Sequence, residues 1–88
     1  MTRNYYDPVY TKWRKDVKKR DGYICQMPRC GYKKSLQVHH IEKWSAQPHL
    51  RYELSNGITL CPWCHKLVNR CEEHYVGLFM EIVRSRND

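Results

Sequence analysis

The chain has 88 residues, with one Phe, three Met and a mean hydropathy of −0.86. A chain of this size forms one domain with a modest core, commonly stapled by a metal or by disulfides, so a large multidomain enzyme is excluded. The formal net charge is +7, and residues 1–34 carry the whole excess, with ten Lys or Arg against three Asp. That concentration is typical of a surface that binds a polyanion, most often nucleic acid, although a solvated basic helix has the same composition.

The sequence shows no export or membrane signal. The first residues, MTRNYYDPVYTKWRK, are polar and basic and do not resemble a signal peptide, and no stretch approaches the length of a membrane span. We therefore expect a cytoplasmic protein with no membrane partner. In that reducing compartment the five cysteines are expected to bind metal in preference to forming disulfides.

The first third of the chain predicts a basic helix followed by a turn. Residues 9–21, VYTKWRKDVKKRD, have helical spacing, and Gly22 ends the helix. Four residues fall near one face of this helix: Val9, Trp13, Val17 and Arg20. Residues 25–34, CQMPRCGYKK, combine a cysteine pair with Pro and Gly, which predicts a knuckle-like turn.

The middle of the chain predicts two short strands joined by a loop. Residues 36–41 alternate in polarity and predict the first strand, whereas residues 42–56 read as a loop. The dipeptide NG at 56–57 is a turn signal, and residues 58–60 predict the second strand.

The last third predicts one long helix. Pro62 suits the first turn of a helix, and apolar residues then recur at helical spacing from about 63 to 85. Gly77 lies inside this pattern and is a possible break. The expected order is therefore helix, knuckle, strand, loop, strand and helix.

The cysteine spacing predicts a structural zinc site. Cys25 and Cys30 form one short-spaced pair, and Cys61 and Cys64 form another. Two such pairs can supply four thiolates to one tetrahedral zinc ion, because each tight turn presents two sulfurs from adjacent positions. Closing the site would join the first third of the chain to the last helix, so that zinc binding adds to the stability of the fold.

Haem attachment and dithiol redox chemistry fit less of the cysteine pattern than zinc does. CPWCH at 61–65 matches a c-type haem attachment pattern, but haem attachment needs export and leaves the first cysteine pair unexplained. CPWC also matches a dithiol redox motif, but the strand–helix–strand context of such motifs is absent. Cys71 falls on the apolar face of the predicted helix and suits the core, although an exchange with Cys64 as a zinc ligand stays open.

Three histidines and one asparagine can meet beside the zinc site. His39 and His40 end the first strand, Asn56 precedes the second, and His65 directly follows Cys64. If the strands pair and the helix packs across them, the three imidazoles converge. Alone, the HH pair would favour partly buried strand residues with satisfied nitrogens, and His65 could be a helix-start residue or an alternative zinc ligand. His49 is expected to be an incidental loop histidine. His74 lies about two and a half helical turns after His65, so a surface histidine is expected there, with contact to DNA or assistance to the site as the open alternative.

The ordered motifs LQVHHI, NGITLC and PWCHK, preceded by WRKDVKKRDGYICQ, closely resemble the HNH endonuclease family. The resemblance covers roughly residues 13–70 and is to the branch with a four-cysteine structural zinc. It implies a small α+β fold with a ββα-metal (His-Me finger) motif, an N-terminal basic helix, a zinc knuckle and a long C-terminal helix. We expect one nuclease domain over 1–88, with its core at about 25–70.

The resemblance also implies roles for individual residues. His40 matches the histidine that acts as general base, and Asn56 matches the residue that orients this base or, in some members, binds the metal. His39 and His65 match ligands of a catalytic divalent ion. The four cysteines Cys25, Cys30, Cys61 and Cys64 match the ligands of the structural zinc. The activity implied is hydrolysis of DNA phosphodiester bonds by a one-metal mechanism, with nicking and double-strand cutting both open.

The sequence departs from the family at His39, where aspartate is more frequent. An all-imidazole ligand set suits Zn²⁺ or Ni²⁺ better than Mg²⁺, and Mn²⁺ also stays in the candidate set. On a regular strand His39 and His40 would point to opposite faces. Because both must reach one phosphate, we expect the strand to end, twist or bulge at this pair, with Asn56 helping to hold the distortion.

The charge map predicts the contacts with DNA. Nine cations of the first third are expected to bind phosphates: Lys12, Arg14, Lys15, Lys18, Lys19, Arg20, Arg29, Lys33 and Lys34. Small members that resemble this chain are common in phages and bacteria, where some work with DNA-packaging or restriction machinery. The alternative function is a zinc-knuckle nucleic-acid-binding module without catalysis.

Overall fold

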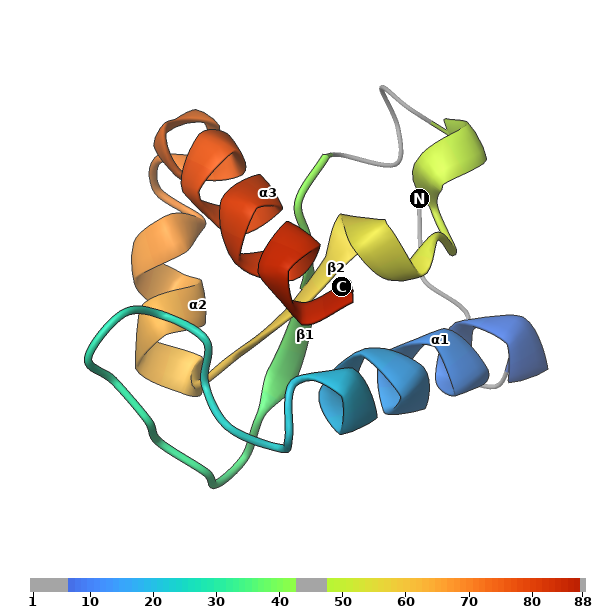
Figure 1. The fold of residues 1–88 in the computed structure, drawn as a ribbon, viewed down its shortest axis with the longest axis horizontal. Helices are drawn as coiled ribbons and strands as arrows, with labels where there is room; N and C mark the ends of the chain where they lie inside the picture. Colours follow the sequence, from blue (N-terminus) through green and yellow to red (C-terminus); the bar gives the residue numbers. More distant parts are fainter. Residues whose placement is uncertain (1–6, 43–47, 88) are drawn as a thin grey trace.

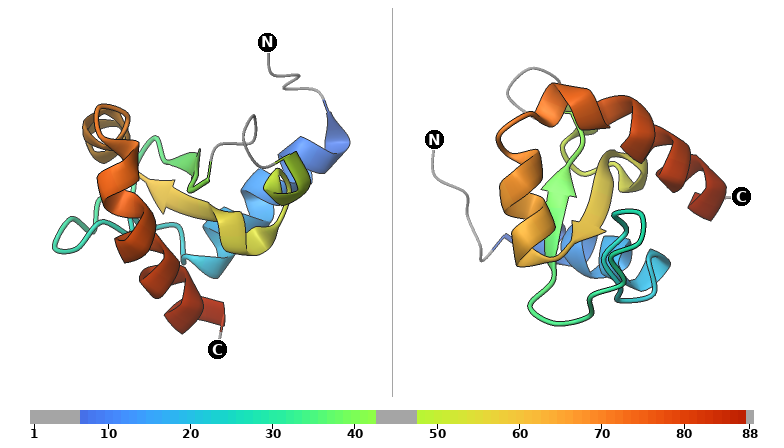
Figure 2. Two further views of the ribbon diagram at one scale, coloured as in Figure 1. Left: turned by 90° about the horizontal axis from the view of Figure 1, so that it is seen from above. Right: turned by 90° about the vertical axis from the view of Figure 1, so that its left-hand side faces the viewer.

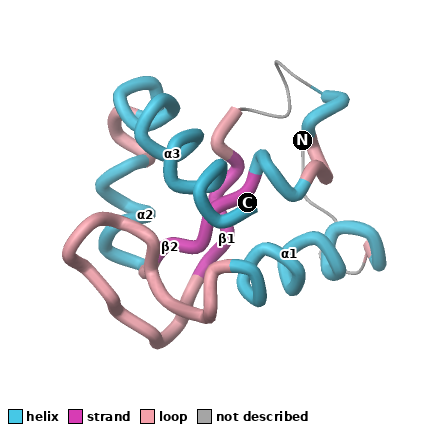
Figure 3. The backbone as a smooth tube through the Cα atoms, viewed as in Figure 1, coloured by secondary structure: helices cyan, strands magenta, loops and turns pink. Residues whose placement is uncertain are grey.

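The computed structural model describes residues 7–42 and 48–87 (Figures 1 and 3). In chain order the elements are α1 (Pro8–Arg20), β1 (Gln37–His40), the 3₁₀ turns η1 (Pro48–Leu50) and η2 (Leu54–Asn56), β2 (Gly57–Leu60), α2 (Pro62–Val68) and α3 (Glu72–Asn87). Within the described ranges, no helix combines the length and apolar character that crossing a bilayer requires. The expected small α+β fold is confirmed, with part of the predicted loop, residues 43–47, outside the described residues.

Helix α1 begins and ends where its sequence dictates. The Asp7 carboxylate accepts a hydrogen bond from the Val9 backbone amide at 2.9 Å, and Pro8 occupies the first turn, where its missing amide hydrogen has no consequence. The last turn holds Lys18, Lys19 and Arg20, whose charges complement the helix dipole. The predicted helix over 9–21 is therefore confirmed to within one residue at each end.

The two strands form an antiparallel pair with an unbroken register. Gln37 pairs with Leu60, and His40 pairs with Gly57 at the other end. Figures 1 and 2 show the strands lying between α1 on one side and the α2–α3 pair on the other. Side chains alternate along a strand, so successive residues of β1 face different helical layers.

Each face of the sheet has its own apolar cluster. On the α1 side, Val38 packs with Tyr10, Trp13 and Val17. On the other side the buried residues come from the knuckle, the residue after β1, the second strand, its end and both later helices: Cys25, Ile41, Ile58, Leu60, Cys61, Val68, Phe79 and Val83. The predicted apolar face of α1 is wrong at Val9, which is 54% exposed, because the buried face is centred on Tyr10 instead.

The C-terminal region forms two helices, so the prediction of one continuous helix is wrong. The break lies at residues 69–71, where Arg70 and Cys71 donate to carbonyls only three residues back, and Gly77 lies within α3. An unbroken helix over 62–87 would be about 39 Å long at 1.5 Å per residue. The longest extent of the molecule is 32 Å. The turn brings Phe79 and Val83 back over the sheet.

Gly57 is required by the close approach of α1 to β2. A Cβ atom at this position would lie 2.6 Å from the Trp13 ring and 2.7 Å from the Val17 side chain. The Gly57→Ala substitution is expected to lower the free energy of unfolding by about 1–3 kcal/mol, as overpacked sites do. Urea unfolding of the zinc-loaded protein measures this change.

Gly77→Ala is the matched control. No atom lies within 4 Å of a Cβ at position 77, in the middle of α3. Because alanine favours helix over glycine, this variant is expected to gain roughly 0.5–1 kcal/mol. Equal effects of the two substitutions would contradict the packing of α1 on β2.

Candidate functional site

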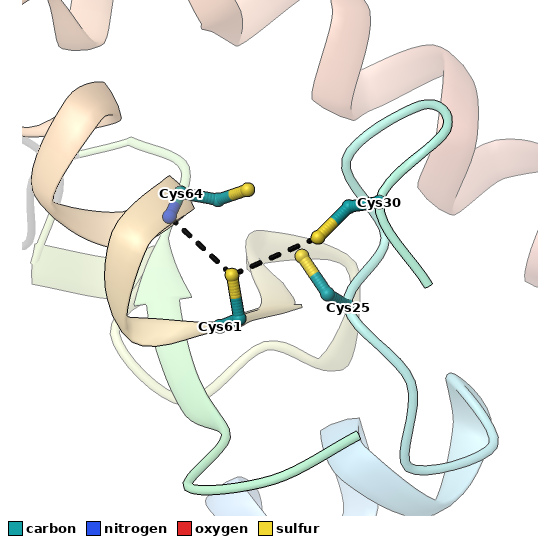
Figure 4. Close-up of side chains that lie close together, drawn as sticks. All are labelled: Cys25, Cys30, Cys61 and Cys64. Carbon is teal, nitrogen blue, oxygen red and sulfur yellow. Dashed lines mark hydrogen bonds between the residues drawn. The ribbon is translucent and has the colours of Figure 1, made fainter. Parts of the chain in front are cut away.

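Four sulfurs from two distant segments converge on one point. The ligand atoms of Cys25, Cys30, Cys61 and Cys64 all lie within 4.8 Å of one another, and they form the only group of three or more potential ligands found among the described residues. Figure 4 shows one pair projecting from the knuckle and the other from the start of α2. The sequence prediction that these two pairs meet is confirmed.

Local backbone geometry directs the sulfurs of each cysteine pair toward the common point. In the knuckle, the Cys30 amide donates to Met27, and Gly31 follows with φ 67°, which glycine adopts without steric cost. At the start of α2, Cys61 is the N-cap residue, and its sulfur accepts a hydrogen bond from the Cys64 amide at 3.4 Å. Zinc binding to Cys61 would therefore also fix the first turn of α2.

The spacing of the sulfurs fits zinc. Zinc–sulfur bonds of about 2.3 Å place the sulfurs of a tetrahedral site roughly 3.8 Å apart. The Cys30 and Cys61 sulfurs lie 3.7 Å apart, far beyond a disulfide bond. Cys71 lies outside the cluster, and its thiol contacts the Leu67 carbonyl at 3.8 Å instead. The exchange of Cys71 for Cys64 that the sequence left open is therefore unnecessary.

The pKa values of the clustered thiols indicate how much they need a bound cation to ionise together. Burial raises the pKa of the Cys25 thiol, and burial together with the neighbouring thiols raises that of Cys64. Burial alone would also raise the pKa of Cys61, but hydrogen bonds from Cys64 and the other two cysteines hold it below its usual value. Four thiolates this close together are compatible with one another only around a metal ion.

His39 and His65 meet on the face of the sheet that α2 and α3 cover. Their ring centroids lie 5.5 Å apart at an interplanar angle of 71°, and His39 also packs edge-on against Phe79 at 5.8 Å. His65 lies in α2, directly after the zinc-cluster cysteine Cys64, so the cluster determines where this imidazole lies. The structure thus brings together the two residues that the sequence predicts as ligands of a catalytic ion.

Gln37 orients His65, although no sequence motif singled it out. The Gln37 side-chain oxygen is hydrogen-bonded to Nδ1 of His65. An amide oxygen accepts, so Nδ1 donates and Nε2 keeps the lone pair that a metal needs. Gln37 lies two residues before His39 on the same face of β1, so the period of the strand was the signal that could have found it.

His40 lies on the opposite face, against α1. Its ring stacks on Trp13, with centroids 4.2 Å apart and planes at 17°. Nε2 of His40 lies 2.9 Å from the Arg51 carbonyl oxygen, and because a carbonyl only accepts, Nε2 is the donor. The ring is 7% exposed. This hydrogen bond fixes the tautomer and the orientation of His40.

The expected distortion of β1 is only partly found. Pairing continues regularly through His39 with Ile58 and His40 with Gly57, so of the three expected distortions the bulge is not found. The strand does end at His40. The two rings therefore leave β1 toward different layers, His39 toward His65 and His40 toward Trp13. The predicted convergence of all three imidazoles is wrong for His40, because side chains alternate along a regular strand.

Asn56 joins the two ends of the segment between the strands through its side-chain amide. Its side chain is 1% exposed and forms three hydrogen bonds, accepting from the Glu42 amide at 2.8 Å and donating to the Glu42 and Leu50 carbonyls at 3.2 and 3.1 Å. The residue after Leu50, Arg51, supplies the carbonyl that holds His40. Asn56 thus fixes the backbone on which the orientation of His40 depends.

Arg20, one of the predicted DNA-binding residues, uses its guanidinium inside the molecule. Its side chain is only 8% exposed and is paired with the fully buried Asp21 carboxylate at 2.9 Å. Arg20 also donates to the backbone carbonyls of Leu54 and Gly57, and Asp21 accepts from the Thr59 amide. These bonds attach the end of α1 to β2 and occupy Nε and both terminal nitrogens of the guanidinium.

Six of the other eight predicted DNA-binding residues are exposed: Lys12, Lys15, Lys19, Arg29, Lys33 and Lys34. Lys12 is paired with Asp16 at 2.7 Å, an exposed pair of little energetic weight. Lys18 is partly buried, and burial with the nearby Arg14 charge lowers its pKa. His49 and His74 are exposed.

Two antiparallel strands followed by a helix, with a four-cysteine cluster at the helix start, fit the ββα-metal nuclease fold. The chain matches the family described as HNH endonuclease over residues 25–70, more than half of its length. The protein therefore belongs to the HNH endonuclease family, which implies a nucleic-acid substrate. Searches of curated proteins and of solved structures each gave no match. The matched residues include the cysteine cluster, both strands and α2.

Removal of one cluster thiol is expected to abolish zinc binding. Structural zinc contributes an apparent free energy of about 10–16 kcal/mol in small zinc-dependent peptides, so Cys61→Ser should lose both the metal and cooperative thermal unfolding. Elemental analysis of the purified protein, with a thermal melt followed by circular dichroism, measures both effects.

Cys71→Ser is the matched control for this experiment. Its thiol lies outside the cluster, so the variant should keep about one zinc per chain. Retention of zinc by Cys61→Ser, or its loss from Cys71→Ser, would contradict the assigned cluster.

Proposed function

We propose that the protein is a metal-dependent HNH endonuclease that hydrolyses DNA phosphodiester bonds, by nicking or by double-strand cutting. The observation that carries this proposal is the His39–His65 pair, with ring centroids 5.5 Å apart beside the four-cysteine cluster of an HNH-family chain. The cluster is the structural zinc site in this proposal, and the histidine pair is the catalytic one.

His39 and His65 would hold one catalytic divalent ion. Imidazole donors suit Zn²⁺ and Ni²⁺, and Mg²⁺ and Mn²⁺ are the further candidates. When bound, such an ion neutralises charge on the phosphate and stabilises the leaving oxygen. Gln37 contributes by holding His65 in the tautomer whose Nε2 can bind metal.

His40 would act as the general base. Neutral imidazole takes a proton from water near pH 7, which is typically worth about 10²–10⁴-fold in rate. The hydrogen bond to the Arg51 carbonyl and the stack on Trp13 hold the ring in one orientation. Asn56 is a positioning residue in this scheme, because it fixes the backbone that carries the Arg51 carbonyl.

The splayed histidines suit an in-line displacement. In such a reaction the attacking and leaving oxygens lie on opposite sides of the phosphorus. In this proposal the phosphate would bind at the end of β1, with the His40 imidazole on one side and the His39–His65 pair on the other. Distortion of the strand is then unnecessary, which replaces the expectation drawn from the sequence.

Exposed lysines and arginines of α1 and the knuckle would bind the DNA backbone. Phosphate contacts position a duplex and carry little sequence information, so we propose weak intrinsic specificity. Arg20 is left out of this set because its guanidinium is used inside the molecule. Any DNA-packaging or restriction partner would then supply the target site.

Substitution of His40 tests catalysis. His40→Phe keeps an aromatic ring on Trp13 but removes the basic nitrogen, so it should fold, keep zinc and bind DNA, while cleavage falls about 10²–10⁴-fold. The measurement is conversion of supercoiled plasmid to nicked or linear forms in Mg²⁺, Mn²⁺, Ni²⁺ and Zn²⁺. His39→Ala should also lose cleavage in every ion.

Two results would contradict the assignment of His40 as general base or of the protein as a nuclease. Cleavage by His40→Phe at the parental rate would make His40 a packing partner of Trp13 only. Salt-sensitive DNA binding without cleavage by the parent protein in any of the four ions would favour the alternative function, a zinc-knuckle binding module. His74→Ala, an exposed histidine outside the site, should cut like the parent.

Arg20 and Lys19 test the division between structural and DNA-binding cations. Arg20→Ala leaves the Asp21 carboxylate buried without its partner, so unfolding should become about 3–5 kcal/mol easier. Lys19→Ala should change stability by less than about 0.5 kcal/mol. Its loss of one phosphate contact should reduce the slope of log K against log salt by about 0.9. Unchanged stability of Arg20→Ala together with a reduced salt slope would show instead that Arg20 binds DNA.

A further inference from the structure

We infer that Tyr32 and Trp63 form a stacking surface for a single-stranded segment of the DNA substrate. We call these two residues the aromatic patch. The inference deepens the proposed nuclease function, on which its biological meaning rests, by naming the form of DNA that the protein takes.

The aromatic patch is exposed and ordered by its surroundings. Trp63 is 65% exposed and Tyr32 is 37% exposed, and their rings meet edge-on at 90° with centroids 5.0 Å apart. Tyr32 follows the cluster cysteine Cys30 by two residues, and Trp63 lies between Cys61 and Cys64. Both aromatic side chains are therefore carried by the backbone that the metal site holds, which keeps them in place for a ligand.

The charge around the patch selects a polyanion. Residues 22–41 and 54–71, the two segments that meet at the cysteine cluster, contain no Asp or Glu. They carry five exposed cations: Arg29, Lys33, Lys34, Lys66 and Arg70. A four-thiolate zinc centre has a formal charge of −2, which leaves this part of the molecule positive. A surface that binds another protein does not need to exclude acidic residues. A surface that binds a phosphate backbone does, because acidic side chains would repel the phosphates.

The position of the patch links it to the candidate active site. Trp63 precedes His65 by two residues in α2, a rise of about 3 Å along the helix axis. Residues two apart on a helix point about 200° apart, so the Trp63 ring and the His65 imidazole lie on different sides of α2. A strand whose bases stack on Trp63 would therefore pass around the first turn of α2 to reach the His39–His65 pair.

Stacking favours a single strand over a duplex. Bases in a duplex stack on one another and hide their faces, whereas unpaired bases can stack on aromatic side chains without regard to sequence. Lys33 and Lys34, next to Tyr32, would follow the backbone of the same strand. The substrate class inferred is DNA with an unpaired stretch beside the cleaved bond, as at a gap, flap or fork.

Fluorescence anisotropy tests this inference without turnover. The probes are a labelled oligo(dT) and a labelled duplex of equal length, added to the zinc-loaded protein with no other divalent ion. Trp63→Leu keeps an apolar side chain but loses the flat ring, and its affinity for oligo(dT) should fall about 5–100-fold, the range of one stacked base. Its affinity for the duplex should change by less than about twofold, because phosphate contacts are kept.

Two further variants complete the comparison. Trp63→Phe retains a stacking face and should bind oligo(dT) within about threefold of the parent, while the tryptophan fluorescence quench caused by oligo(dT) disappears. Leu78→Ala removes an exposed apolar side chain from α3 and should match the parent on both probes.

Three outcomes would overturn the inference. These are unchanged oligo(dT) binding by Trp63→Leu, equal losses by Trp63→Leu and Trp63→Phe, and equal losses on the single strand and the duplex. The second outcome would point to an apolar docking surface for a protein. Because the assay measures binding only, it can fail while plasmid cleavage depends on His40, and it can succeed while cleavage is absent.

Discussion

The junction of two cysteine pairs is the constraint on which the rest of the structure depends. The apolar clusters on either side of a two-stranded sheet are small, and a lone pair of strands is marginally stable in water. The cluster joins residues 25–30 to residues 61–64 and makes Cys61 both a candidate ligand and the N-cap of α2. The start of α2 then fixes His65. Fold stability and the geometry of the candidate active site therefore depend on the same four sulfurs.

The alternation of the strand divides the chemistry between two layers. His39 faces α2 and α3, and His40 faces α1, because side chains alternate along β1. Each histidine is held by residues of its own layer, Gln37 on one side and Trp13 with the Arg51 carbonyl on the other. A regular strand thus positions two adjacent imidazoles independently, which a bulge that forced them onto one face would not do.

The sequence predicts the elements whose signals are local. Cysteine spacing and the helical period of α1 are each contained in a short stretch, and they yield the cluster and the first helix. The turn expected at NG is wrong, because Asn56 ends η2 and Gly57 begins β2 with an extended backbone. The break between α2 and α3 was not predictable in this way, since Val68, Phe79 and Val83 fit one helical period whether or not the helix is continuous. The sequence also does not distinguish basic residues that face the solvent from those that are bonded inside the molecule. Arg20 looks like its neighbours in the sequence, and only the packing of α1 on β2 reveals Asp21 and the Gly57 carbonyl as its partners. Contacts between α1 and the sheet, such as Trp13 with His40, likewise depend on tertiary packing and leave no periodic trace in the sequence.

The amide of Asn56 has a consequence for how this family member can diversify. By bonding to Glu42 and Leu50 it ties together both ends of the segment between the strands, so the strands do not depend on the length of chain enclosed. Loop closure becomes less favourable by only about 0.6 kcal/mol for each doubling of loop length. An insertion between residues 42 and 50 would therefore leave the register of β1 and β2 unchanged. Neither histidine depends on that length, because His39 packs against His65 and Phe79, and His40 against Trp13.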